Sequence, residues 1–332
     1  YICFMKNALE SFKDRVCHSL LLQSLVSSSA LLQKQAFPLT EAEISQLEKQ
    51  GNRAVSWDAI RKTGSFSGCE NIWNNRFIGP CKIGDCSGTL EVHGKQRSCG
   101  IFNSTLCDAV LEDHILISDI PTLQNVIVHT QAILLDIRLL SGTPGSLFGI
   151  GSLIPIGSEL GTRNLISHPE WDPESIASFF ASDQVQREEI RKMLEVRLPG
   201  IRSDYSVIGE GAKVLHSGIL RGVYLAAKSR CEGVLELDQV FLTETQSGVV
   251  NLGPGIICRN SIIHGGASVS DNAQVFSSII FDSSELTQQG LVKNSVIGPD
   301  CALAQGEVTS SFLGPFVSAH HQSLLISAIW PA

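Results

Sequence analysis

Residues 250–282 read VNLGPGIICRNSIIHGGASVSDNAQVFSSIIFD, and this stretch decides the predicted fold. Five of its apolar residues fall six positions apart: Ile257, Ile263, Val269, Val275 and Phe281. A helix would place such residues three or four positions apart, and a half-buried strand would place them two apart. A step of six instead suits a parallel β-coil in which short strands alternate with tight turns. We therefore predict that this part of the chain winds into a parallel β-helix.

The same unit, an aliphatic residue followed by glycine, recurs far from this stretch. It begins at Ile78, Ile83, Ile208, Leu252, Ile297 and Leu313. In a β-coil the aliphatic residue fills the interior, and glycine adopts corner conformations that a Cβ would obstruct. The pattern resembles left-handed β-helix proteins of the hexapeptide-repeat class. That resemblance implies a mainly β fold, a left-handed parallel β-helix (a hexapeptide-repeat solenoid) with an N-terminal helical arm and a helical insertion.

Helical stretches precede the repeat at the N-terminus and interrupt it once further along the chain. Residues 5–34 carry apolar residues at helical steps, and Thr40 with Glu43 forms a capping box that opens a short helix ending near Lys49. Residues 168–198 are proline-led, charged and helix-periodic. We therefore predict four segments, which are an N-terminal helical arm over 1–64, a first β-helix block over 65–164, a helical insertion over 165–204 and a second β-helix block over 205–332.

Composition excludes two classes of partner. The 332 residues carry a net charge of −8, which disfavours binding to the nucleic-acid backbone. No apolar run is long enough for a bilayer span, so we expect no membrane-spanning segment. Charged residues make up only 17% of the chain, which suits a coil-rich β protein better than a helical one.

The ten cysteines do not form a recognisable metal or disulfide framework. No Cys-x-x-Cys motif occurs, and no cysteine and histidine pairs stand at zinc-site spacing, so we predict no metal. Several cysteines fall on the repeat, where a small apolar residue is needed. Reduced, buried thiols indicate a reducing compartment, with the plastid stroma favoured and the cytoplasm as the alternative.

Three motifs carry a closer resemblance: SLFGIG at 146–151, ELGTR at 159–163 and GPFVSAHHQSLLI at 314–326. In this order they resemble a family of hexapeptide-repeat proteins known as a domain of unknown function. Related repeats form the C-terminal region of plastid UDP-glucose pyrophosphorylase-like proteins. The resemblance runs from about Pro38 to the end and implies an association with sugar-nucleotide metabolism. Because no Gly-rich phosphate loop is present, it does not imply uridylyl transfer.

The ends of the chain also bear on this resemblance. The sequence begins at Tyr1 rather than Met, and the family continues beyond the position of Pro331. We therefore expect a piece of a longer protein.

His320 and His321 are the candidate catalytic residues. Acyltransferases of the hexapeptide class use a histidine as the general base, with acetyl-CoA as the acyl donor. The alternative is structural, with one histidine packed at a corner and the other in solvent. A base needs an oriented partner, and the sequence identifies none. Outside this alternative we predict no cofactor.

Glu159, Arg163 and Trp73 are the candidate ligand-binding residues. Arginine recognises phosphate and carboxylate groups, so Glu159 and Arg163 would hold an anionic or phosphorylated ligand. An ion pair that fixes the helical insertion explains them equally well. Trp73, between Asn71 and Asn74, would form a sugar platform, or it would pack beside corner asparagines.

The leading functional hypothesis is a non-catalytic hexapeptide-repeat module, a structural or regulatory subunit of a larger assembly. Its partners would be proteins or further copies of itself, with a sugar nucleotide as a candidate ligand. The alternative is a hexapeptide acyltransferase. A protein like the γ-carbonic anhydrases is a third hypothesis, although their closely spaced ligand histidines have no counterpart in this sequence.

Overall fold

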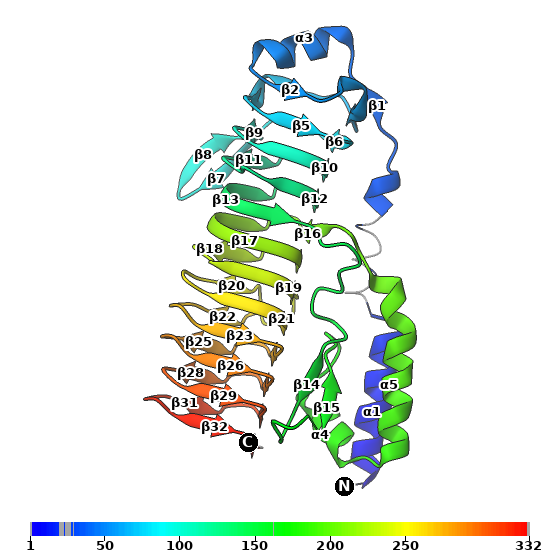
Figure 1. Ribbon diagram of the computed structural model, residues 1–332, viewed down its shortest axis with the longest axis vertical. Coiled ribbons are helices and arrows are strands. Elements are labelled where there is room, and N and C mark those ends of the chain that lie inside the picture. The colour runs from blue at the N-terminus through cyan, green and yellow to red at the C-terminus, as the bar shows by residue number, and fades with distance from the viewer. Residues whose placement is uncertain (1, 20–22, 24–27, 29, 162, 331–332) are drawn as a thin grey trace. The chain divides into compact units, whose positions relative to one another are not determined.

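The computed structural model describes residues 2–19, 23, 28, 30–161 and 163–330, and it is mainly β (Figure 1). Among these residues, 29 strands belong to one hydrogen-bonded sheet in which most pairs are parallel. Two antiparallel hairpins lie outside that sheet. They are β7 (Thr89–Val92) with β8 (Lys95–Ser98), and β14 (Leu153–Pro155) with β15 (Asn164–Ile166).

From β16 (Ser206–Ile208) onward, consecutive paired strands of the large sheet are separated by 16 or 17 residues. Val269 of β22 pairs with Leu286 of β25, 17 positions on (269 to 286), and Leu286 pairs with Leu303 of β28 at the same interval. All three side chains are buried. We call each such pass of the chain a layer. A few layers are one residue shorter, as where Leu291 pairs with Glu307 (291 to 307).

The predicted fold, a left-handed parallel β-helix or hexapeptide-repeat solenoid, is therefore wrong. Three hexapeptides would need 18 residues in each layer, so a six-residue step falls out of register by one position with every layer. A slip of one residue moves a strand side chain to the opposite face. Accordingly, Ile257 of the predicted series is only half-buried, while the residue that follows it, Cys258, is fully buried.

A column of buried serines marks the layer spacing. Its members are Ser261, Ser278, Ser295 and Ser311, all fully buried. The Ser278 backbone N–H donates to Ser261 Oγ at 3.1 Å, and the two following steps repeat this bond at 3.0 Å. Each hydroxyl in turn donates to the carbonyl two residues before it, at 2.7–2.8 Å. We call these four residues the serine ladder, and through it polar groups in the interior satisfy one another.

Corners between strands use the left-handed backbone region. Asn260, Ser277 and Asn294, at equivalent positions in successive layers, have φ values of 50°, 46° and 50°. Asparagine tolerates this region because its short polar side chain bonds locally. Asn74, a predicted corner residue, also lies there, with φ at 55°.

The chain divides into two compact units. Unit 1 comprises 1–26, 147–202 and 239–332, and unit 2 comprises 27–146 and 203–238. Unit 2 contains the hairpin β7–β8, the helix α3 (Glu41–Lys49) and the short helices η1 (Leu31–Gln33), η2 (Trp57–Ala59) and η3 (Cys69–Asn71). Its sheet strands are β1 (Phe37–Pro38), β2 (Arg53–Ala54), β3 (Ile60–Lys62), β4 (Ile72–Trp73), β5 (Arg76–Ile78), β6 (Cys81–Ile83), β9 (Gly100–Phe102), β10 (Thr105–Leu111), β11 (Leu116–Ser118), β12 (Leu123–Val128), β13 (Ile133–Ser141), β16 (Ser206–Ile208), β17 (Lys213–Leu225) and β18 (Arg230–Glu232).

Unit 1 contains the helices α1 (Ile2–Cys17), α4 (Pro173–Ala181), α5 (Gln184–Arg197) and η4 (Leu198–Ile201), together with the hairpin β14–β15. The division between the units falls within β19 (Glu236–Leu242). The sheet strands of unit 1 are β20 (Asn251–Leu252), β21 (Ile257–Ile263), β22 (Ser268–Val269), β23 (Gln274–Phe276), β24 (Ile279–Ile280), β25 (Glu285–Thr287), β26 (Leu291–Lys293), β27 (Val296–Ile297), β28 (Ala302–Ala304), β29 (Glu307–Thr309), β30 (Phe312–Leu313), β31 (Ser318–Ala319), β32 (Leu324–Ile326) and β33 (Ile329–Trp330).

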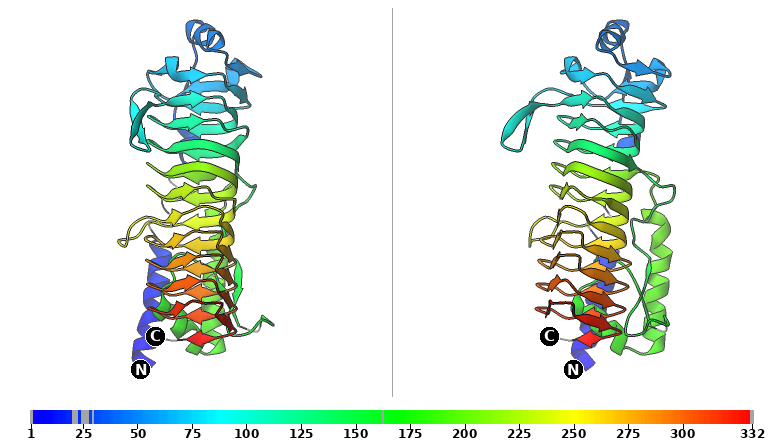
Figure 2. Two further views of the ribbon diagram at one scale, coloured as in Figure 1. Left: turned by 90° about the vertical axis from the view of Figure 1, so that its left-hand side faces the viewer. Right: turned by 60° about the vertical axis from the view of Figure 1, so that its left-hand side comes forward.

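The helices begin where local sequence signals place them. Thr40 and Glu43 form the predicted capping box of α3, with Thr40 N donating to Glu43 Oε2 at 2.7 Å. Asp172 accepts from Ser175 N at 2.7 Å and caps α4, whose first residue is Pro173. Within unit 1, α1 packs against α4, and Lys13 of α1 forms an ion pair with Glu189 of α5 at 3.2 Å. The yellow-to-red strands of unit 1 stack one above another (Figure 2). The predicted helix over 5–34 extends into residues outside the described part of the chain.

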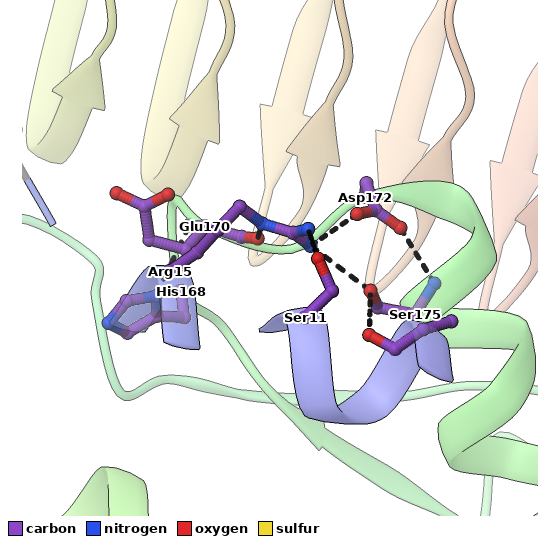
Figure 3. A network of polar contacts seen from close by, with 7 residues as sticks. Ser11, Arg15, His168, Glu170, Asp172 and Ser175 are labelled. Carbon is purple, nitrogen blue, oxygen red and sulfur yellow. Dashed lines mark hydrogen bonds and ion pairs between the residues drawn. The ribbon is translucent and has the colours of Figure 1, made fainter. Parts of the chain in front are cut away.

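A stacked aromatic pair and a polar network hold α1 against the segment that precedes α4. The ring of Phe12, fully buried, stacks on Trp171 with centroids 3.6 Å apart. Arg15 forms an ion pair with Asp172 and donates to the Glu170 carbonyl at 3.2 Å (Figure 3). No helix among the described residues is long and apolar enough to span a membrane.

Candidate anion-binding site

A cavity of about 340 Å³ lies in unit 1 beside the helices α4 and α5. We call it the arginine cavity, because three of its lining residues are arginines. It is lined by Arg163, Asn164, Phe179, Phe180, Gln184, Arg187, Glu188 and Arg191.

Three elements supply the arginines and the aromatic rings. Arg163 and Asn164 lie where the β14–β15 hairpin enters β15, held by the bond from Ile156 N to Arg163 O at 2.8 Å. Arg187 and Arg191 are four positions apart on α5, so they lie on one face of that helix. Phe179 is the buried aromatic residue at the end of α4.

The charge of the cavity is unbalanced. Three arginines line it with a single acidic residue, Glu188, whose carboxylate pairs with Lys192 at 4.0 Å. Across the described part of the chain, no carboxylate forms an ion pair within 4.0 Å of Arg163, Arg187 or Arg191, although Arg187 donates to the Ser182 carbonyl. Arginine keeps its charge at any relevant pH, so these residues give the cavity a positive charge that favours an anion.

Phosphate and carboxylate groups suit this arrangement best. A guanidinium binds them through two parallel N–H···O bonds, and a charge-assisted bond is about twice as strong as a neutral one. The side-chain amides of Asn164 and Gln184 add neutral donors and acceptors to the same cavity. The rings of Phe179 and Phe180 add an apolar surface.

The structure separates the predicted ligand-binding residues. Arg163 lines the arginine cavity, whereas Glu159 lies exposed in the hairpin turn and does not line it. No ion pair joins the two side chains among the residues that the structure describes. Trp73 belongs to unit 2, is 49% exposed, and donates from Nε1 to the Glu70 carbonyl at 2.6 Å. Its predicted role as a sugar platform stays a prediction.

His320 and His321 lie at an exposed corner after β31. His321 has φ at 60°, and the two rings are 6.2 Å apart. Within the described residues, neither imidazole has a hydrogen-bonded or ion-paired partner. The predicted catalytic role stays a prediction, without the orienting group that a general base needs.

A second cavity of unit 1, of about 440 Å³, contains a more buried histidine. His264 Nδ1 is 3.6 Å from Asp282 Oδ1, and its Nε2 is buried with no partner among the described side chains. Burial lowers the pKa of His264 to about 4, so the ring is neutral at pH 7. Because Nε2 is buried away from the cavity and Nδ1 faces the Asp282 carboxylate, neither nitrogen of His264 is well placed to take a proton from a ligand.

The sequence pattern did not identify Arg187 and Arg191, because it predicts only a charged helical insertion over this stretch. The available signal was the pair of arginines at i and i+4 soon after two adjacent phenylalanines. That signal becomes informative only once the fold brings Arg163 to the same cavity. No group of three metal-ligating side chains occurs within the described residues.

Residues 37–331 match the family model described as a domain of unknown function, DUF4954. No curated protein matches the sequence. All residues of the arginine cavity fall inside the matched range, whereas helix α1 falls outside it.

Proposed function

This chain belongs to the DUF4954 family, and from that premise we propose that it is a ligand-binding module of a larger assembly. The ligand is a small molecule that carries phosphate, and it binds in the arginine cavity. One observation carries this proposal: three arginines line one cavity that has a single acidic residue. Binding there would regulate the assembly, and no chemical step at the cavity is needed.

A sugar nucleotide has the chemistry that this cavity recognises. Its diphosphate would lie between the guanidinium groups of Arg163, Arg187 and Arg191. Its sugar hydroxyls would bond to the amides of Asn164 and Gln184, and its base would contact the phenylalanine rings. The volume of about 340 Å³ lies within the range of ordinary small-molecule sites.

Calorimetric titration with UDP-glucose and with pyrophosphate tests this proposal. We expect Arg163→Gln and Arg191→Gln each to weaken binding about tenfold or more, because each removes a charge-assisted contact worth about 1.5–3 kcal/mol. Glu188→Gln should tighten binding, because it removes the negative charge of the cavity. Lys95→Gln, which removes a positive charge from an exposed hairpin strand of unit 2, serves as the control. Equal affinities in all four variants would refute the proposal, as would no binding at millimolar ligand.

The proposed association with protein partners is supported by a separate surface. Large apolar side chains are exposed on β32 and β33, including Leu324, Ile329 and Trp330. Contiguous exposed apolar surface is typical of protein interaction sites. The experiment is native mass determination of the protein isolated from its source. If the proposal holds, Leu324→Lys with Ile329→Lys releases the partner, and a monomeric native mass for the unaltered protein would contradict it.

A further inference from the structure

Three polar side chains of unit 2 form one hydrogen-bonded chain, in a different unit from the arginine cavity. Ser28 Oγ lies 2.8 Å from His129 Nε2, and His129 Nδ1 lies 2.9 Å from Glu112 Oε2. Both distances are those of normal hydrogen bonds. The order hydroxyl, imidazole, carboxylate is the one by which nucleophilic serines are activated on unrelated folds.

The protonation pattern of this chain follows from its donors and acceptors. An ionised carboxylate only accepts hydrogen bonds, so a neutral His129 must carry its proton on Nδ1 and donate it to Glu112. Nε2 is then the acceptor, and the Ser28 hydroxyl is the donor. This is the tautomer in which an imidazole acts as the base toward a serine.

The fold brings the imidazole and the carboxylate together through strand pairing. Leu111 of β10 pairs with Val128 of β12, so Glu112 and His129, which follow them, lie at the same corner of adjacent layers. Glu112 N donates to the Val128 carbonyl at 2.9 Å. The hydrogen bond from His129 and the nearby charge of Lys34, whose Nζ is 3.7 Å away, lower the pKa of Glu112. Glu112 is therefore ionised when His129 is neutral.

We propose that Ser28, His129 and Glu112 form a nucleophilic site that cleaves small activated carboxylic esters. Ser28 Oγ forms a bond to the acyl carbon while its proton moves to His129 Nε2. The bond from that carbon to the alkoxy oxygen breaks, and the leaving alcohol takes the proton from Nε2. Water then attacks the acyl-serine, giving its proton to Nε2, and the carboxylic acid leaves as Ser28 regains its hydrogen. Glu112 is a positioning residue, because it touches only the imidazole.

The size of the acyl group is limited by the burial of the serine. Ser28 is 4% exposed, whereas the side chains of His129 and Glu112 are 22% and 19% exposed. A substrate therefore approaches along the exposed edge of the imidazole, and only a short acyl chain reaches Ser28 Oγ. Acetyl esters fit this description.

Leu32 and Lys34, which follow Ser28 in the chain, have attachments of their own. Lys82 Nζ donates to the carbonyls of Leu32 and Lys34, at 2.5 and 2.9 Å. Because these bonds do not involve the serine hydroxyl, Ser28→Ala should leave them unchanged. A variant at Ser28 therefore tests the chemistry of the hydroxyl separately from these attachments.

Labelling of the whole chain with methanesulfonyl fluoride, a reagent as small as an acetyl group, tests this inference. The serine oxygen forms the bond to sulfur, and fluoride leaves, so we expect one methylsulfonyl group on Ser28, located by peptide mass spectrometry. Ser28→Ala should remove the label, while the control Ser98→Ala, on an exposed strand of a separate hairpin, should keep it. His129→Gln should slow labelling by about 100-fold or more, the range of general base catalysis.

Two further variants separate chemistry from structure. Glu112→Gln should slow both labelling and hydrolysis of p-nitrophenyl acetate, and Glu112→Asp should recover part of that loss, which a purely structural contact would not do. Lys192→Gln, which lies outside both sites, should leave labelling unchanged. An unlabelled Ser28 in the wild-type protein, or an equal rate of ester hydrolysis in Ser28→Ala, would overturn the inference.

Discussion

At the scale of single residues, burial decides the charge of the most enclosed histidines. His168 is 2% exposed, and burial, with the positive charge of Arg197 as a smaller cause, lowers its pKa to about 3. Its Nδ1 accepts from Glu170 N at 3.2 Å, and its Nε2 has no partner among the described residues. The ring is therefore neutral in the folded protein and serves as an acceptor ahead of helix α4.

This histidine makes stability depend on pH. Its pKa in the unfolded chain is about 6.5, so between pH 6.5 and about 3 the unfolded state binds more protons than the folded state. The free energy of unfolding should therefore fall as pH falls through this window, by up to about 1.4 kcal/mol per pH unit from this group. His168→Asn retains an acceptor and cannot titrate, so urea unfolding between pH 7 and 5 should give a flatter curve. Exposed His320→Gln is the control, and parallel curves for all three proteins would refute this assignment.

At the scale of elements, the serine ladder links successive layers through single hydroxyl groups. Removing one hydroxyl leaves a buried backbone N–H without an acceptor, which lowers the free energy of unfolding by about 1–3 kcal/mol. We expect Ser278→Ala to lower the free energy of unfolding by this amount, because Ser295 N loses its acceptor at 3.0 Å. Exposed Ser318→Ala should change it by less than about 0.5 kcal/mol. Denaturant unfolding measures both, and equal effects would show that the ladder contributes nothing specific.

Helix α1 gives a second prediction at this scale, because an aromatic stack is the main apolar contact among those that hold it. Phe12→Ala removes a fully buried ring from Trp171, at a cost of about 3–5 kcal/mol. If that loss appears as local opening, trypsin should cleave after Lys13 and Arg15 about 100-fold faster or more. Phe12→Leu keeps most of the buried apolar volume and should be cleaved at an intermediate rate. Unchanged cleavage in the alanine variant would mean that other contacts hold the helix.

The same elements show what the sequence could predict. Local signals were sufficient for the helix starts, because the side chains of Thr40 and Asp172 bond to backbone groups only three residues away. The layer length was not predicted, because Ile263, Val269 and Val275 are buried at six-residue steps within a single layer. Only pairing across layers reveals the interval of 17. Arg163 was identified by its own chemistry, whereas its partners depend on contacts between distant parts of the chain.

At the scale of the whole molecule, the cysteines report on each unit separately. The nine cysteines whose side chains the structure describes form no disulfide with one another, and burial raises the pKa of Cys81 to about 11 and of Cys258 to about 12. Cys81 belongs to unit 2 and Cys258 to unit 1. Because the thiolate is the reactive form, iodoacetamide at pH 8 should modify exposed Cys17 quickly and these two only upon unfolding.

The urea dependence of this alkylation then compares the two units. If Cys81 and Cys258 become reactive at the same urea concentration, the units unfold together, and different concentrations would show that they unfold independently. Modification of Cys258 in the native protein as fast as that of Cys17 would contradict its burial. Peptide mass spectrometry after quenching distinguishes the three sites.

The regular length of the layers also determines where the gene can gain or lose codons. A codon added within a strand would displace every later side chain of that strand by one position. The next backbone N–H of the serine ladder would then no longer meet the serine hydroxyl that accepts its hydrogen bond. A segment inserted at a corner avoids this, as where Val126 pairs directly with Ser206 although 79 residues separate them (126 to 206). The hairpin β7–β8 is a second such addition, and Gly94 in its turn has open space around it. A peptide tag inserted at Gly94 should therefore leave the strand pairing and register of all layers unchanged.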